Sequence, residues 1–107
     1  MKITFEGFYD TDSGHDFDMP MFMVSPCVQM VDVGNSGYAE NMVEDYFIDW
    51  DIDGKKPRNH KGLLMSQVKK DFTASKKKGK RFKYWKAVVE YDPKNLMEFD
   101  ILEKVGW

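Results

Sequence analysis

The sequence predicts an α+β fold: an antiparallel sheet of about four to five strands, with one or two helices packed on one face and a C-terminal β-hairpin. Three observations lead to this prediction. Apolar and polar residues alternate in residues 2–9, apolar residues recur at helical spacing in residues 61–74, and two apolar strands flank Pro93. With 107 residues and neither a repeat nor a low-complexity linker, the chain is expected to form a single domain, residues 1–107.

The chain opens with a strand followed by an acidic loop. Ile3 and Phe5 alternate with polar residues, which predicts a strand over residues 2–9 with Gly7 as a candidate β-bulge. Residues 10–18 contain four aspartates and a Ser-Gly pair without any periodicity, so we expect a loop there.

An apolar segment follows at residues 21–33. Pro26 interrupts it, and proline cannot donate a hydrogen bond to a neighbouring strand. We therefore expect an irregular or edge strand in this region. The sequence Gly-Asn-Ser-Gly at residues 34–37 predicts a turn.

Residues 37–53 carry two competing patterns. Apolar residues at helical spacing are Ala39, Met42, Val43, Tyr46, Phe47 and Trp50. Within the same segment, Ile48, Trp50 and Ile52 alternate with aspartates, which is a strand pattern. We interpret the segment as a helix over residues 37–45 that leads into a strand over residues 46–52.

A second helix is predicted after the loop at residues 54–59. Leu64, Val68 and Phe72 occur at i, i+4 and i+8, which predicts a helix over residues 61–74. Asn59 is a candidate N-cap for this helix. Residues 75–80 then form a predicted loop of cations around Gly79.

The predicted C-terminal hairpin has an expected register. The pairs that place apolar residues on one face are Tyr91–Met97, Val89–Phe99 and Ala87–Ile101, with Asp92 opposite Leu96. This register requires a three-residue loop, residues 93–95. Pro93 suits the first central position of a type I turn, and Asn95 tolerates the left-handed conformation that closes such a loop.

The net charge of −2 conceals a strong separation of charge along the chain. Residues 1–54 contain twelve acids and one base, whereas residues 55–107 contain fifteen bases and six acids. Between residues 55 and 86 there are thirteen bases and one acid, Asp71. Such asymmetry indicates a polyanionic or strongly charged partner, unless the two halves neutralise each other in the fold.

The segment from Lys76 to Tyr91 combines most of this positive charge with aromatic rings. Read with period two, Trp85, Ala87, Val89 and Tyr91 form a core face. The opposite face and the preceding loop combine rings with cations, as surfaces that bind nucleic acid do. The predicted nucleic-acid-binding residues are Lys76, Lys77, Lys78, Lys80, Arg81, Phe82, Lys83, Tyr84 and Lys86. The alternative is a solvated lysine loop, with Phe82 and Tyr84 packed under a helix.

Two acidic segments were considered as metal sites. Asp49 to Gly54 matches the opening D-x-D-x-D-G of a calcium loop, but the twelfth position is His60 instead of an acid, and cations follow the glycine. We expect a strand that ends in a turn there. Asp10, Asp12, His15, Asp16 and Asp18 fit no standard ligand spacing, so we predict no metal site.

No catalytic motif was found, and we predict a protein that is not an enzyme and has no cofactor. Cys27 lies in an apolar segment, where a thiol is expected to be inert packing. The single cysteine excludes an internal disulfide, and no apolar run is long enough to span a membrane. We expect a cytoplasmic protein with no membrane partner.

Two functional hypotheses follow from the sequence. In the first, the protein is a non-catalytic module that contacts RNA or single-stranded DNA through its basic, aromatic-bearing loop and hairpin. In the second, it is a small inhibitor or adaptor, of the kind found as viral proteins in phages or in mobile elements. Such a protein binds a protein or nucleoprotein target, for example a nucleic-acid-processing protein, through its charge-segregated surface.

Overall fold

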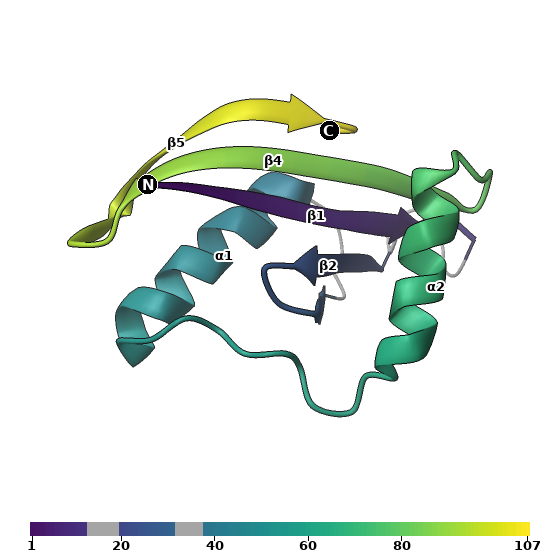
Figure 1. The fold of residues 1–107 in the computed structure, drawn as a ribbon, viewed down its shortest axis with the longest axis horizontal. Helices are drawn as coiled ribbons and strands as arrows, with labels where there is room; N and C mark the ends of the chain where they lie inside the picture. Colours follow the sequence, from purple (N-terminus) through teal and green to yellow (C-terminus); the bar gives the residue numbers. More distant parts are fainter. Residues whose placement is uncertain (13–19, 32–37) are drawn as a thin grey trace.

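The computed structural model describes residues 1–12, 20–31 and 38–107. The helices and strands within these residues are β1 (Lys2–Asp10), β2 (Met21–Ser25), β3 (Gln29–Val31), α1 (Tyr38–Asp53), α2 (Met65–Lys76), β4 (Phe82–Asp92) and β5 (Asn95–Val105). The described strands form one antiparallel sheet in the order β3-β2-β1-β4-β5, and β4 and β5 form the C-terminal hairpin (Figure 1). The predicted α+β fold class is confirmed.

Each face of the sheet carries one helix. Alternation along β1 places Phe5 on one face and Phe8 on the other, and along β4 it places Trp85 with Phe5 and Phe82 with Phe8. Helix α1 packs on the Phe5 face and α2 on the Phe8 face (Figure 1). The expectation that the helices pack on one face is wrong, because Phe8 and Phe82 give the second face an apolar surface of its own and α2 covers it. As a result, α2 lies against the first residues of β4.

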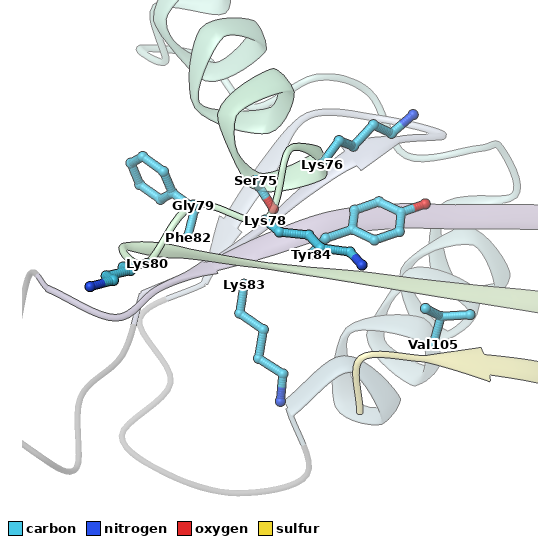
Figure 2. Close-up of a pocket in the computed structure, with 9 residues that line it drawn as sticks. All are labelled: Ser75, Lys76, Lys78, Gly79, Lys80, Phe82, Lys83, Tyr84 and Val105. Atoms are coloured by element: carbon cyan, nitrogen blue, oxygen red, sulfur yellow. The ribbon is translucent and has the colours of Figure 1, made fainter.

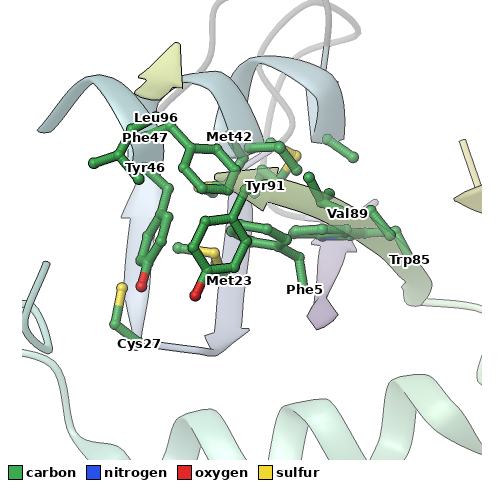
Figure 3. Packing of buried hydrophobic residues seen from close by; sticks show 14 of the residues in the cluster. Phe5, Met23, Cys27, Met42, Tyr46, Phe47, Trp85, Val89, Tyr91 and Leu96 are labelled. Carbon is green, nitrogen blue, oxygen red and sulfur yellow. The ribbon is translucent and has the colours of Figure 1, made fainter. Parts of the chain in front are cut away.

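The larger core lies between α1 and the sheet. The predicted core face of β4 is confirmed, because its four residues are buried there: Trp85, Ala87, Val89 and Tyr91. Phe5 meets Tyr46 edge to face with ring centroids 5.1 Å apart (Figure 3). Phe47 stacks on Phe99 with ring centroids 4.8 Å apart. Aromatic pairs of this kind contribute about 0.5–1.5 kcal/mol each beyond the area that they bury.

The predicted strand over residues 46–52 is wrong, since α1 continues to Asp53. The helical spacing decides the structure because it buries Tyr46 and Phe47 against the sheet, whereas Ile52 of the alternating pattern is 75% exposed. Burial of two aromatic side chains outweighs a local strand pattern on the solvent side. Gly54 follows the last residue of the helix and has a left-handed φ of 72°. Its N–H donates to the carbonyl of Trp50 at 2.8 Å, which closes the last turn of α1.

Helix α2 covers the second, smaller core. Val68 is buried with Phe8 of β1, while Phe72 is half-buried beside them. The helix begins at Met65 and ends at Lys76, later at both ends than the predicted residues 61–74.

Asn59 is not the N-cap that we predicted for α2. Its side-chain oxygen instead accepts the Val28 N–H at 2.8 Å, and the His60 N–H donates to the Val28 carbonyl at 2.7 Å. These bonds fasten the connection between the two helices to the turn between β2 and β3. Asn59 lies too far before Met65 to reach the first turn of the helix, and the N-cap position, Leu64, makes no side-chain capping bond.

The hairpin forms with a shorter loop than predicted. Asp92 pairs with Asn95 across a two-residue turn, and the Lys94 N–H donates to the Asp92 carboxylate at 2.9 Å. The register then shifts on β5, so that Tyr91 pairs with Phe99 and Val89 with Ile101. This shift keeps two apolar residues on the core face without the predicted loop. Met97, which we placed in the core, is 52% exposed, and Leu96 is buried instead.

The irregular strand predicted for residues 21–33 is confirmed in its described part. β2 ends immediately before Pro26, and the short β3 follows as an edge strand of the sheet. The pairing of β1 with β2 shifts between Glu6 and Gly7, as expected for an irregularity at Gly7. The predicted turn at residues 34–37 and most of the predicted acidic loop lie outside the described residues.

Gly7 and Trp85 are in direct contact at the centre of the sheet. The Trp85 side chain is fully buried, and its indole N–H donates to the Phe22 carbonyl at 3.2 Å. A Cβ atom at residue 7 would lie 2.7 Å from the Trp85 ring and would overlap the same Phe22 carbonyl. A hydrogen atom is therefore the only side chain that this position accommodates.

We predict that Gly7→Ala lowers the free energy of unfolding by more than about 3 kcal/mol, because the backbone of β2 or the Trp85 ring must move. Urea unfolding followed by tryptophan fluorescence measures the change. Gly54→Ala is the matched control, since its Cβ would meet no atom within 4 Å. Its left-handed φ alone predicts a loss of about 1 kcal/mol. Equal losses for the two variants would contradict the steric argument.

Candidate nucleic-acid interface

The predicted interface is centred on the turn that joins α2 to β4, here called the basic turn (residues 76–81). The turn begins with a Schellman motif: the Lys78 N–H donates to the Ser75 carbonyl at 3.1 Å and the Gly79 N–H to the Ala74 carbonyl at 3.4 Å. Lys78 takes the left-handed position of the motif, with a φ of 61°. Glycine usually occupies this position because a Cβ atom is strained there. The sequence thus places a cation where glycine would be more stable.

Three lysines of the basic turn are available to a partner: Lys77, Lys78 and Lys80. Each is exposed, and none forms an ion pair with any residue that the structure describes. The carbonyl of Lys80 and that of Arg81 are bonded to Thr11, which follows β1. The turn is therefore anchored at both ends while its ammonium groups face solvent.

The other cations of the predicted site have protein partners. Arg81 contacts both carboxylate oxygens of Asp10, at 3.3 and 3.4 Å, and this hydrogen bond raises the pKa of Arg81. Lys76 lies 3.7 Å from Glu6 and Lys86 lies 4.0 Å from Glu103. Exposed pairs of this kind contribute about 0–1 kcal/mol, so Lys76 and Lys86 can exchange their carboxylate for another anion at low cost.

Phe82 and Tyr84 are half-buried under α2, as in the alternative that we considered. The Phe82 ring packs edge to face on Phe8 with centroids 5.3 Å apart, and Tyr84 lies 6.0 Å from Phe72. The Tyr84 hydroxyl donates to Glu6 at 2.6 Å, and burial followed by this bond raises the pKa of Tyr84. Only the outer part of each ring remains for a ligand.

Lys83 lies apart from the rest of the predicted site. Because side chains alternate along β4, it projects from the opposite side of the strand to Phe82 and Tyr84 (Figure 2). Its ammonium group lies 5.9 Å from the centroid of the Tyr9 ring. The Lys83 side chain is therefore directed away from Phe82 and Tyr84, although the residue still contributes to the pocket beside the basic turn.

A pocket of about 380 Å³ opens beside the basic turn. Its lining residues are Ser75, Lys76, Lys78, Gly79, Lys80, Phe82, Lys83, Tyr84 and Val105 (Figure 2). Ser75 and Val105 are lining residues that the sequence analysis missed. Ser75 continues the spacing of Val68 and Phe72 by three further positions, so the helical pattern could have placed it on the buried side of α2.

Ser75 has an unusual environment for a polar side chain. The residue is 1% exposed, and its hydroxyl oxygen has no hydrogen-bond partner among the described residues. A buried hydroxyl without a partner costs about 1–3 kcal/mol, and serine in a helix can usually bond to a carbonyl one turn earlier. A residue that lines the pocket therefore carries a buried hydroxyl with no hydrogen-bond partner in the described part of the chain.

The other candidate sites of the sequence are arranged differently from the basic turn. Asp49, Asp51 and Asp53 lie in the last turns of α1, so the predicted strand there is wrong and the segment is not an open loop. No group of three or more potential metal ligands occurs among the residues described by the structure. His15 and its acidic neighbours at residues 16 and 18 lie outside those residues.

Cys27 is buried, as expected for a packing residue. Burial, and secondarily the charge of Asp49, raises the pKa of its thiol to about 11. A thiol with this pKa is almost entirely protonated at neutral pH, and the protonated form is a poor nucleophile.

The charge separation along the chain becomes a separation between the two faces of the sheet. Helix α1 carries six acids and no base, while α2 and the basic turn lie on the opposite face. None of the acids of α1 is in an ion pair within the described part of the chain. Burial and the neighbouring Asp49 raise the pKa of Asp45. Among the described residues, Glu6 and Asp10 of the acidic half pair with Lys76 and Arg81 of the basic turn, so the neutralisation seen there is partial.

Comparisons with known proteins identify no relative. No family model, no curated protein and no solved structure matches the chain. Within the described residues, neither helix has the length and apolar character needed to cross a membrane.

We predict that Lys78→Gly raises the free energy of unfolding by about 0.5–1 kcal/mol, because glycine relieves the left-handed strain. Thermal or urea unfolding measures the change. Lys77→Gly removes the same charge from the neighbouring residue, whose φ is −81°, and is expected to be destabilising by a similar amount. A gain in stability for both variants would show that charge repulsion, and not the backbone, is responsible.

We also predict that Cys27 resists alkylation by iodoacetamide in the folded protein at pH 8, because its pKa of about 11 leaves little thiolate and burial excludes the reagent. Mass spectrometry of timed samples measures the rate, and the urea-unfolded protein is the control. Since the unfolded thiol ionises near pH 9, its ionisation makes the folded state less stable as the pH rises from 9 toward 11. Rapid modification of the folded protein would contradict the buried position.

Proposed function

We propose that this protein is a non-catalytic module that binds RNA or single-stranded DNA through its basic turn. The observation that carries the proposal is the presence of three exposed lysines, Lys77, Lys78 and Lys80, without carboxylate partners in the described residues. One of them occupies a strained backbone position that favours glycine. Strain that stability does not require is typical of functional positions.

The electrostatics of this face support a polyanionic partner. Lysines that contact phosphates release counterions from the nucleic acid, and this release favours binding at low salt. Lys69 and Lys70 are exposed on α2, and the ion pair between Lys76 and Glu6 is partly exposed to solvent. A phosphate backbone that follows α2 toward the basic turn meets these cations in succession.

The rings under α2 favour an unpaired strand over a duplex. Phe82 and Tyr84 keep their outer parts accessible at the pocket. An unpaired base can reach such a surface, whereas the bases of a duplex remain stacked on each other. Base contacts of this kind contribute about 1–3 kcal/mol each and depend little on sequence.

The acidic face supports a second candidate function, an inhibitor or adaptor that binds a protein. The six acids of α1 surround two exposed apolar side chains, Ile48 and Ile52, which are 37% and 75% exposed. A basic surface of a nucleic-acid-processing protein would be complementary to this helix. In either case we propose a cytoplasmic location, in keeping with the single reduced cysteine.

We predict that the triple variant Lys77→Ala, Lys78→Ala, Lys80→Ala binds a fluorescent single-stranded oligonucleotide at least about tenfold more weakly at roughly 0.1 M salt. Its salt dependence should fall by roughly two to three units of slope, since each lost phosphate contact removes about 0.7–0.9. Fluorescence anisotropy at several salt concentrations measures both quantities with RNA and with DNA.

The control variant removes three lysines from the opposite end of the molecule: Lys2, Lys55 and Lys94. These lie at the start of β1, after α1 and in the β4–β5 turn, at the end of the molecule away from the basic turn (Figure 1). All three are exposed, and we expect less than about a twofold change. Equal losses of affinity for the two triple variants would show that binding depends on the net charge of the protein and not on the basic turn. If the wild-type protein binds neither RNA nor single-stranded DNA at low salt, the nucleic-acid proposal is wrong and the protein-binding candidate takes its place.

A further inference from the structure

We propose that the pocket beside the basic turn is a nucleotide subsite, which takes one nucleoside monophosphate unit of the bound strand. This inference rests on the proposed function and names the part of the strand that the pocket recognises. The residues that line the pocket provide a buried hydroxyl without a partner among the described residues, several lysines and two aromatic rings (Figure 2). Each of these three features matches a different part of a nucleotide.

The hydroxyl of Ser75 is the feature that calls for a ligand. The residue is 1% exposed and lines the pocket, and its buried hydroxyl lacks a hydrogen-bond partner among the described residues. A serine hydroxyl can donate one hydrogen bond and accept two, so it can bond to a phosphate oxygen or to a polar atom of a base. A ligand in the pocket would remove the cost of leaving this group unpaired.

The charge around the pocket selects an anion. Lys76, Lys78 and Lys80 contribute to the lining, and no acidic residue does. The pocket lies at the C-terminal end of α2, where the helix dipole is negative and opposes an anion. The Schellman bonds occupy the carbonyls of Ala74 and Ser75, and Glu6 already lies 3.7 Å from Lys76. Lys78 and Lys80 have no carboxylate partner among the described residues, and their two charges exceed the half charge of the dipole. The net field in the pocket therefore favours a phosphate.

The remaining walls are apolar and extend beyond the space that a phosphate fills. The Phe82 and Tyr84 rings lie on either side of Ser75, and Val105 at the end of β5 lies on the side of Tyr84 (Figure 2). A volume of about 380 Å³ lies within the range of small-molecule sites. An inorganic phosphate would leave the aromatic wall uncovered, whereas a nucleotide places its base against that wall and its phosphate at the lysines.

The test is a titration of the full-length protein with adenosine 5′-monophosphate, followed by two-dimensional NMR of the backbone amides. We expect shifts to concentrate at Ser75, Phe82 and Tyr84, with a dissociation constant of about 1 mM or below. Adenosine and inorganic phosphate are titrated separately, and each is expected to bind more weakly than the nucleotide. Inorganic phosphate binding as tightly as the nucleotide would overturn the assignment of the aromatic wall to a base.

The variant Ser75→Ala separates the hydroxyl from the fold. We expect it to bind the nucleotide about threefold to tenfold more weakly, as for the loss of one hydrogen bond to an anion, with an unchanged or higher melting temperature. Ser66→Ala, at an exposed position near the start of the same helix, is the matched control and should bind like the wild type. Unchanged nucleotide affinity in Ser75→Ala would overturn the proposed role of the hydroxyl.

The same titrations distinguish this inference from the proposed function. If oligonucleotides bind and the mononucleotide shifts no resonance at the pocket, the subsite is refuted while the function stands. If the mononucleotide binds at Ser75 but neither RNA nor single-stranded DNA binds, the pocket stands and the proposed partner class is refuted.

Discussion

The contact between Trp85 and Gly7 holds the centre of this fold together. The indole of Trp85 reaches from β4 across β1 and donates its hydrogen bond to Phe22 of β2, so a single side chain links three neighbouring strands. Such a crossing is possible only because residue 7 has no Cβ atom. One face of β4 is thereby committed to the core beneath α1. The other face is left for α2 and for the residues that line the pocket.

The sequence predicted the fold where one pattern had no competitor. Alternation alone identified the buried face of β4, because Trp85 and Val89 lie on it and the charged residues Lys86 and Glu90 lie on the other face. It failed at residues 46–52, where Ile52 completed a strand pattern although the ring of Phe47 was required in the core. Local alternation carries no information on which face has a partner. The hairpin loop failed for a similar reason, since an irregularity on β5 restored the apolar face that the longer loop was meant to provide.

The candidate site was predictable in its charges and less so in its geometry. The composition marked the lysines, but only the structure shows that Lys76 contacts a carboxylate and that Lys80 contacts none among the residues described. The left-handed residue could not be read from the sequence, because Gly79 is the expected choice and Lys78 takes that role. The buried position of Ser75 could have been predicted from helical spacing. Its lack of a partner could not, since that depends on every group around it.

The placement of α1 and α2 on opposite faces has a consequence for how the molecule approaches other charged bodies. The six acids of α1 and the exposed lysines of the basic turn lie on opposite faces of the sheet, which gives the described part of the protein an electric dipole although the net charge is only −2. In the field of a polyanion the whole molecule orients before contact, so that the basic turn faces the polyanion and helix α1 faces away from it. Association is then oriented and fast at low ionic strength, and it slows once the Debye length falls below the thickness of the domain.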